Sequence, residues 1–133
     1  MPTESHVPKK ILIVDDSLTS VMWQQLVLKQ EPYEIVVAND GQAGVEAAVA
    51  SRPDLILMDM VMPRMNGLEA LRAIRATRGL ASVPVIMVTT RSEMKNIEAA
   101  FASGCTEYIT KPIDRTELLG KVRAHLGAAS AVA

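Results

Sequence analysis

The sequence predicts an α/β domain of the doubly wound kind, in which helices cover both faces of a five-stranded parallel sheet. Short apolar runs alternate along the chain with longer amphipathic stretches. The first, third and fourth runs are continuously apolar, as strands covered on both faces should be. The connections are short, and repeated strand–helix units with short connections build a parallel sheet with helices on both sides.

The individual elements can be placed from these patterns. The predicted strands cover residues 11–14, 35–38, 55–58, 83–88 and 108–109. The predicted helices cover residues 18–30, 42–51, 67–77, 92–102 and 115–126.

Helical spacing and capping residues support several of these helices. Asn66 can cap the third helix, and Asp114 with Glu117 three residues later predicts a capping box for the fifth. Gly104 follows the fourth helix, where a C-cap glycine belongs. Apolar residues recur at helical intervals in three helices: Leu68, Leu71 and Ile74; Met94, Ile97 and Phe101; Leu118, Val122 and Leu126.

The composition is that of one folded domain with two short tails. Of 133 residues, 49% are hydrophobic and 22% charged, which is too apolar for disorder. We expect a polar N-terminal tail at 1–8, one domain at 9–126 and a small-residue C-terminal tail at 127–133; either tail could be the stub of a linker in a longer protein.

The charge balance and the single cysteine restrict partners and compartment. With 14 basic and 15 acidic residues, the chain offers no field of one sign for nucleic acid or a membrane surface, and we expect it to bind neither directly. Cys105 has no cysteine to pair with and is expected to be a small apolar filler. No apolar run approaches the roughly 20 residues of a membrane span, so we expect a cytoplasmic protein.

Polar side chains follow four of the five predicted strands. Asp15 and Asp16 follow the first, Asp59 the third, Thr89 and Thr90 the fourth, and Lys111 the fifth. In such sheets ligands bind beyond the carboxyl ends of the strands. Converging carboxylates repel one another unless a cation joins them, and Mg²⁺ prefers hard oxygen ligands. A lysine and a hydroxyl opposite such a cation suit a phosphoryl group, and a carboxylate can be the nucleophile.

Four segments together make the chain resemble response-regulator receiver domains over roughly residues 9–126. They are Ile11-Leu-Ile-Val-Asp-Asp-Ser17, Leu57-Met-Asp-Met-Val-Met-Pro-Arg-Met-Asn-Gly67, Val88-Thr-Thr90 and Tyr108-Ile-Thr-Lys-Pro112. Each segment alone is a weak signal, but four in order at strand ends are specific. The resemblance implies a flavodoxin-like sheet of order 2-1-3-4-5.

The resemblance also implies a role for each acidic residue. Asp59 resembles the phosphoacceptor of the family. Asp15 and Asp16 resemble the acid pair that holds Mg²⁺, with Asp59 and the backbone carbonyl of Val61 as further ligands.

The remaining positions resemble the family's switch residues. Thr89 resembles the hydroxyl that turns toward the phosphoryl group, and Lys111 resembles the lysine that pairs with a phosphoryl oxygen. The bond from Lys111 to Pro112 is expected to be cis, a form realistic only before proline. Tyr108 resembles the aromatic side chain that swings between two positions, although a tyrosine at a strand edge is often simply packed.

The partners implied are those of two-component or chemotaxis-type phosphorelays in bacteria. A histidine kinase or a histidine phosphotransfer protein would be the donor, and a protein target would bind the face formed by the fourth helix, fifth strand and fifth helix. The chain would catalyse only its own phosphorylation and dephosphorylation, so it would not be an enzyme acting on a separate substrate.

Two positions depart from the pattern of the chemotaxis regulator. Val61 is apolar where that protein has an amide, and Arg91 stands where it has an acid. Together with Thr90, which is larger than the alanine or glycine often found there, they are expected to tune the lifetime of the phosphorylated state.

Three alternatives to a phosphoacceptor receiver domain are a phosphatase, a degenerate receiver and a fragment of a larger protein. An aspartate-nucleophile phosphatase of the haloacid-dehalogenase kind would carry an Asp-x-Asp motif after the first strand, which is absent here. A degenerate receiver that only binds partners is disfavoured because the key positions are intact. A receiver excised from a larger regulator or hybrid kinase remains open.

Two further patterns, a group of methionines and the apolar stripes of the first helix, can be interpreted either as packing or as functional. The methionines at 58, 60, 62 and 65 could form a thioether copper site, but packing is favoured. In the first helix, Leu18, Met22 and Leu26 form one stripe, whereas Ser20, Trp23 and Val27 form another. The resemblance favours Trp23 and Val27 inward, which leaves the first stripe open for docking of a phosphodonor.

Overall fold

The computed structural model describes residues 8–127, and five parallel strands form one sheet within them. The strand order is β2-β1-β3-β4-β5, so the predicted doubly wound fold and its order are confirmed. The predicted tails at 1–8 and 127–133 lie almost wholly outside the described residues. The strands are β1 (Lys10–Val14), β2 (Glu34–Ala38), β3 (Leu55–Asp59), β4 (Val85–Thr89) and β5 (Glu107–Thr110).

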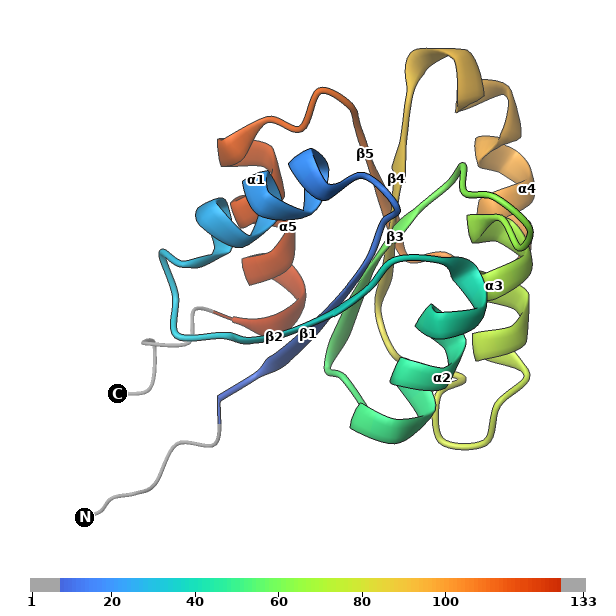
Figure 1. Ribbon diagram of the computed structural model, residues 1–133, viewed down its shortest axis with the longest axis horizontal. Coiled ribbons are helices and arrows are strands. Elements are labelled where there is room, and N and C mark those ends of the chain that lie inside the picture. Colours follow the sequence, from blue (N-terminus) through green and yellow to red (C-terminus); the bar gives the residue numbers. More distant parts are fainter. Residues whose placement is uncertain (1–7, 128–133) are drawn as a thin grey trace.

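The helices divide between the two faces of the sheet, as Figure 1 shows. Helices α1 (Leu18–Leu28) and α5 (Arg115–Leu126) cover one face, and their apolar side chains pack on Ile11, Ile13 and Leu57. Helices α2 (Gly41–Ser51), α3 (Gly67–Arg75) and α4 (Ile97–Ala102) cover the other face. Since β1, β3 and β4 are buried on both faces, their side chains are apolar apart from Lys10 at the start of β1 and the polar residues that end β3 and β4.

The packing predictions for sulfur-containing residues are confirmed. Met58, Met60 and Met62 belong to the core on the α2–α3–α4 face, and Met65 packs against it. Cys105 is buried in the same cluster. These methionines therefore serve as core residues, as expected for flexible apolar side chains.

Caps fix where several helices begin. Asn66 and Glu69 form a complete capping box at α3, which confirms the predicted Asn66 cap. Asp114 accepts the Glu117 N–H at 2.8 Å, which confirms half of the predicted capping box. The other half is wrong, because the Glu117 carboxylate pairs with Lys121 at 3.2 Å instead of accepting the Asp114 N–H. Gly104 follows α4 with φ of 105°, a conformation that favours glycine.

The largest difference from the predicted elements concerns residues 92–102. The predicted single helix is a 3₁₀ segment, η1 (Arg91–Asn96), followed by the short helix α4. Thr90 gives no side-chain cap, and its hydroxyl lies 2.9 Å from that of Ser92. The Asn96 side chain donates to Glu93. Such local side-chain bonds compete with α-helical pairing, which explains the tighter turn.

Smaller boundary errors have simple causes. β4 begins at Val85 instead of residue 83, because Pro84 has no N–H and joins the sheet only through its carbonyl, which accepts from Ile56. α1 ends at Leu28, ahead of the turn before Pro32. Among the described residues no helix has both the length and the apolar character that crossing a membrane would require.

Candidate functional site

The site lies at the carboxyl ends of β1, β3 and β5, where the sheet brings together residues far apart in sequence. Asp15 follows β1 and is only 1% exposed. Its Oδ1 accepts the Ser17 N–H at 2.9 Å. Its Oδ2 lies 3.3 Å from the Gln24 amide nitrogen and 3.4 Å from Lys111 Nζ. A buried carboxylate needs such partners, and here both of its oxygens have them.

Asp59 and Lys111 approach Asp15 from the ends of β3 and β5. Asp59 ends the fully buried β3 and is 6% exposed. Lys111 Nζ lies 3.4 Å from Asp59 Oδ1, so one ammonium group pairs with two carboxylates. The Lys111–Pro112 bond is cis, as expected. Gly67 lies against the Asp59 backbone, where any Cβ atom would collide with the Asp59 carbonyl oxygen.

The three acidic residues form a set that suits a divalent cation. Oxygen atoms of Asp15, Asp16 and Asp59 all lie within 4.8 Å of one another. Asp16 is exposed whereas the other two are buried, so the cluster opens to solvent on one side. An all-oxygen donor set with an open side fits Mg²⁺, which keeps several of its waters when it binds proteins.

Burial and, after it, the neighbouring Asp15 charge raise the pKa of Asp59 from 3.8 to about 7, against the opposing effect of Lys111. The charged form of Asp59 is therefore costly in the absence of a cation. A perturbed carboxyl group at the end of a buried strand is typical of a functional position.

The predicted switch residues lie on the neighbouring strands β4 and β5. Thr89 is 1% exposed, and its hydroxyl donates to the Thr90 carbonyl at 3.2 Å. The Tyr108 ring packs edge-to-face on Phe101, with centroids 6.3 Å apart. Phe101 keeps 45% of its surface exposed, although it belongs to the apolar spacing of its helix.

Lys121 on α5 contacts both the ring and the backbone of Tyr108, an arrangement that no motif in the sequence indicated. Its Nζ lies 5.2 Å from the Tyr108 ring centroid and donates to the Tyr108 carbonyl at 2.6 Å. It also pairs with Glu107 at 3.4 Å and with Glu117. Lys121 thus joins α5 to β5, and the contact between the Tyr108 and Phe101 rings continues to α4.

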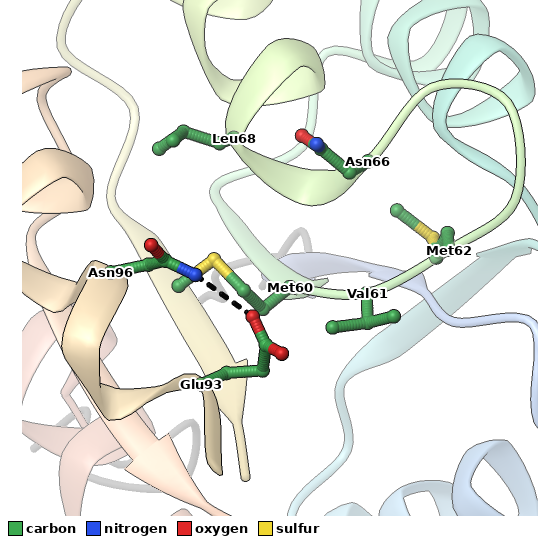
Figure 2. A pocket seen from close by; sticks show the side chains of 7 residues that line it. All are labelled: Met60, Val61, Met62, Asn66, Leu68, Glu93 and Asn96. Carbon is green, nitrogen blue, oxygen red and sulfur yellow. Dashed lines mark hydrogen bonds between the residues drawn. The ribbon is translucent and has the colours of Figure 1, made fainter.

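The residues expected to tune lifetime lie at the rim of the site. Val61 is 54% exposed, and Arg91 is also exposed. A cavity of about 300 Å³ adjoins Val61. Figure 2 shows its lining, in which Glu93 and Asn96 lie across from Val61, Asn66 and Leu68. Glu93 accepts from Asn96 at 2.9 Å and brings a carboxylate near Val61 that sequence spacing did not indicate.

The exposure of α1 largely follows the expectation. Leu18, Met22 and Leu26 are 73%, 60% and 57% exposed, and Val27 is buried. Trp23 is only partly inward: it remains 38% exposed, although its indole N–H donates to the Ile113 carbonyl at 2.9 Å. An open apolar stripe therefore runs along α1 from the end of β1.

Curated relatives resemble the chain over most of its length. It is 38% identical to "Response regulator ArlR" of Staphylococcus saprophyticus over 88% of the chain and 52% of that protein. It is 36% identical to "DNA-binding response regulator MtrA" of Mycobacterium tuberculosis over 89% of the chain and 50% of that protein. The chain thus spans about half the length of these curated relatives. Since one is named as DNA-binding, they do not support the expectation that nucleic acid is not bound directly.

Solved structures and a family model agree with this likeness. The Vibrio cholerae chemotaxis protein CheY4 has a TM-score of 0.83 at 29% identity, covering 90% of this chain and 99% of that one. The receiver domain of the sensor histidine kinase PA1611 from Pseudomonas aeruginosa, solved with magnesium in its active-site cleft, has a TM-score of 0.83 at 30% identity, covering 92% and 100%. The model of the response regulator receiver domain matches residues 11–123. With the fold and the acidic cluster described above, these matches show that the chain belongs to the response regulator receiver domain family.

Proposed function

We propose that the chain accepts a phosphoryl group on Asp59 from a histidine kinase or a histidine phosphotransfer protein. The observation that carries this proposal is the meeting of three carboxylates within 4.8 Å beside Lys111, whose Nζ lies 3.4 Å from Asp59 Oδ1. Fixed positive charge around a carboxylate nucleophile is what phosphoryl transfer requires.

In the transfer step, an Asp59 carboxylate oxygen attacks the phosphorus of a phosphohistidine. A P–O bond forms while the P–N bond breaks, and its electron pair returns to the imidazole. Lys111 lies where its ammonium can pair with a phosphoryl oxygen, and the Thr89 hydroxyl needs only to leave the Thr90 carbonyl to donate to another.

Mg²⁺ would be held by Asp15, Asp16 and Asp59, with the Val61 backbone carbonyl as a further ligand. When bound, it supplies positive charge that favours ionised Asp59 and offsets the charge of the phosphoryl oxygens. Asp16 is exposed and stays open to solvent, which leaves a side from which the ion and the donor can enter.

Hydrolysis would end the signal by attack of water on phosphorus, which returns Asp59 and inorganic phosphate. The chain would then catalyse only reactions of its own phosphoryl group. Rearrangement of Thr89 and Tyr108 would carry the signal to a protein target at the α4–β5–α5 face. We assign this role to a domain of residues 9–126, which in its longer relatives is one part of the protein.

The test is labelling by a small phosphodonor such as acetyl phosphate, followed by intact mass. The parent protein should gain one phosphoryl group with Mg²⁺ and none with EDTA, and Asp59→Asn should gain none. Asp54→Asn is a matched control, because Asp54 precedes the same strand and its carboxylate accepts the Lys10 N–H at 2.8 Å, away from the acidic cluster. Equal labelling of Asp59→Asn would contradict the proposal.

A further inference from the structure

Gln24 is a buried polar residue that packing alone does not explain. It lies on the inward face of α1 and is 1% exposed, among residues that are otherwise apolar on that face. Its amide nitrogen lies 3.3 Å from Asp15 Oδ2, 3.2 Å from the Ser20 carbonyl and 3.2 Å from Ser20 Oγ. The side chain thus bridges the start of α1 to the acidic cluster.

The orientation of the Gln24 amide is fixed by its surroundings. Asp15 Oδ2 and the Ser20 carbonyl can only accept hydrogen bonds, so the NH₂ group must face them. The opposite orientation would set an amide oxygen against a carboxylate and a carbonyl. In the contact between Gln24 and Asp15, the amide N–H therefore donates and the carboxylate accepts.

This orientation leaves the Gln24 Oε1 atom buried without a hydrogen-bond partner, alone among the buried side-chain polar atoms of the residues described. An unpaired buried acceptor is unfavourable, whereas an apolar side chain of similar size would fill the space without that penalty. A purely structural role would be better served by methionine or leucine. The contact that would be lost is the one with Asp15.

We propose that Gln24 is a positioning residue for the acidic cluster, which holds the Asp15 carboxylate in the orientation that binds Mg²⁺. Asp15 is held by Ser17 on one oxygen and by Gln24 and Lys111 on the other. Lys111 pairs with Asp59 as well, so Gln24 is the partner of Oδ2 that stays with Asp15. Outer partners of this kind orient a ligand before the ion arrives. The inference rests on the proposed phosphoacceptor function.

The test is Mg²⁺ affinity in Gln24→Met and Gln24→Leu, measured from NMR shifts of the backbone amides that follow β1. Both variants should bind Mg²⁺ about tenfold more weakly, the lower end of what loss of an outer partner causes, because Ser17 and Lys111 remain. Their urea midpoints should be unchanged or higher, since the unpaired oxygen is gone. Gln25→Met makes the same change at the next residue of α1, which lines a surface groove with Met22 and Leu26. This variant should leave the Mg²⁺ affinity unaltered.

The other possible results contradict either the role of Gln24 or the proposed function. Unchanged affinity with lower stability would make Gln24 a structural residue and overturn the proposal. Weakened binding in only one of the two variants, or equally in Gln25→Met, would point to side-chain shape or a general effect and would also overturn it. Absence of Mg²⁺ binding by the parent protein would instead contradict the proposed function itself.

Discussion

At the scale of single residues, Asp59 is placed where its charge is unfavourable. Burial and the Asp15 charge raise its pKa from 3.8 to about 7, against the opposing effect of Lys111. The folded protein therefore keeps a proton that the unfolded chain has already lost at pH 5 or 6. The free energy of unfolding should fall as pH rises from about 4 to about 7 and then level off.

Asp59→Asn should consequently stabilise the protein above neutral pH. The gain at pH 8 without Mg²⁺ should be about 2 kcal/mol after allowance for solvent screening at the open side, and it should vanish below pH 4, where both side chains are neutral. Urea unfolding at several pH values measures this difference. A gain that is the same at pH 4 and pH 8 would show that the Asp59 charge is not the cause.

Val61 and Arg91 should set how long the phosphoryl group persists. Hydrolysis needs a water in line with the phosphorus, and the exposed Val61 side chain offers it no hydrogen bond. Val61→Asn and Arg91→Glu should each speed loss of phosphate about fivefold, the worth of one orienting bond. The measurement is decay after donor removal, with Val49→Asn, an exposed valine of α2, as control. Variants that decay no faster than the parent would refute this role.

The meeting of the candidate site residues could be predicted because parallel strands end at one edge of their sheet. Asp15, Asp59 and Lys111 meet there for that reason. Gln24 and Lys121 could not be predicted, because their contacts depend on which helix face turns inward. In α1 the two stripes have the same helical spacing, so the sequence pattern does not tell which stripe is buried. Packing against α5 and the sheet decides this.

At the scale of elements, Lys121 couples α5 to β5, and the Tyr108 ring in turn packs on Phe101 of α4. Lys121→Met keeps the aliphatic stem but removes the cation over Tyr108 and the bonds to Glu107 and Glu117. We expect a loss of about 1 kcal/mol in the free energy of unfolding, with faster motion of the Tyr108 ring in NMR spectra. Lys95→Met, at an exposed position of η1, is the control. An unaltered Tyr108 signal would argue against the coupling.

The open stripe of α1 should serve docking of the phosphodonor. Leu18 and Met22 are mostly exposed and can be changed to lysine with little loss of stability. The double variant should slow transfer from a cognate kinase roughly tenfold, as loss of an apolar contact patch does, while labelling by acetyl phosphate is spared. Val49→Lys provides an exposed apolar site on another helix. Equal loss by both routes would mean that the stripe supports the fold.

Element boundaries were less predictable than element types. Apolar periodicity indicated one helix at 92–102, yet the hydrogen bonds that divide it involve Thr90, Ser92 and Asn96, which carry no apolar signal. Conversely, α5 begins and ends as predicted because Asp114 caps its start and Gly127 follows its end. Periodicity reports which face is buried, whereas local polar bonds decide how tightly the backbone turns.

At the scale of the whole molecule, the two helical layers fix the sheet from both sides, and the acidic cluster lies at its carboxyl edge. The sheet therefore acts as a rigid base, while the loops after β3 and β4 carry Val61, Thr90 and Arg91.

The central claim is that Asp59 carries the phosphoryl group, and chemical trapping tests it most directly. After incubation with acetyl phosphate and Mg²⁺, borohydride reduces an aspartyl phosphate to homoserine, which peptide mass spectrometry can place in the sequence. We predict homoserine at position 59 alone, and none when EDTA is present. Homoserine at Asp15 or Asp16 with an unmodified Asp59 would contradict the account.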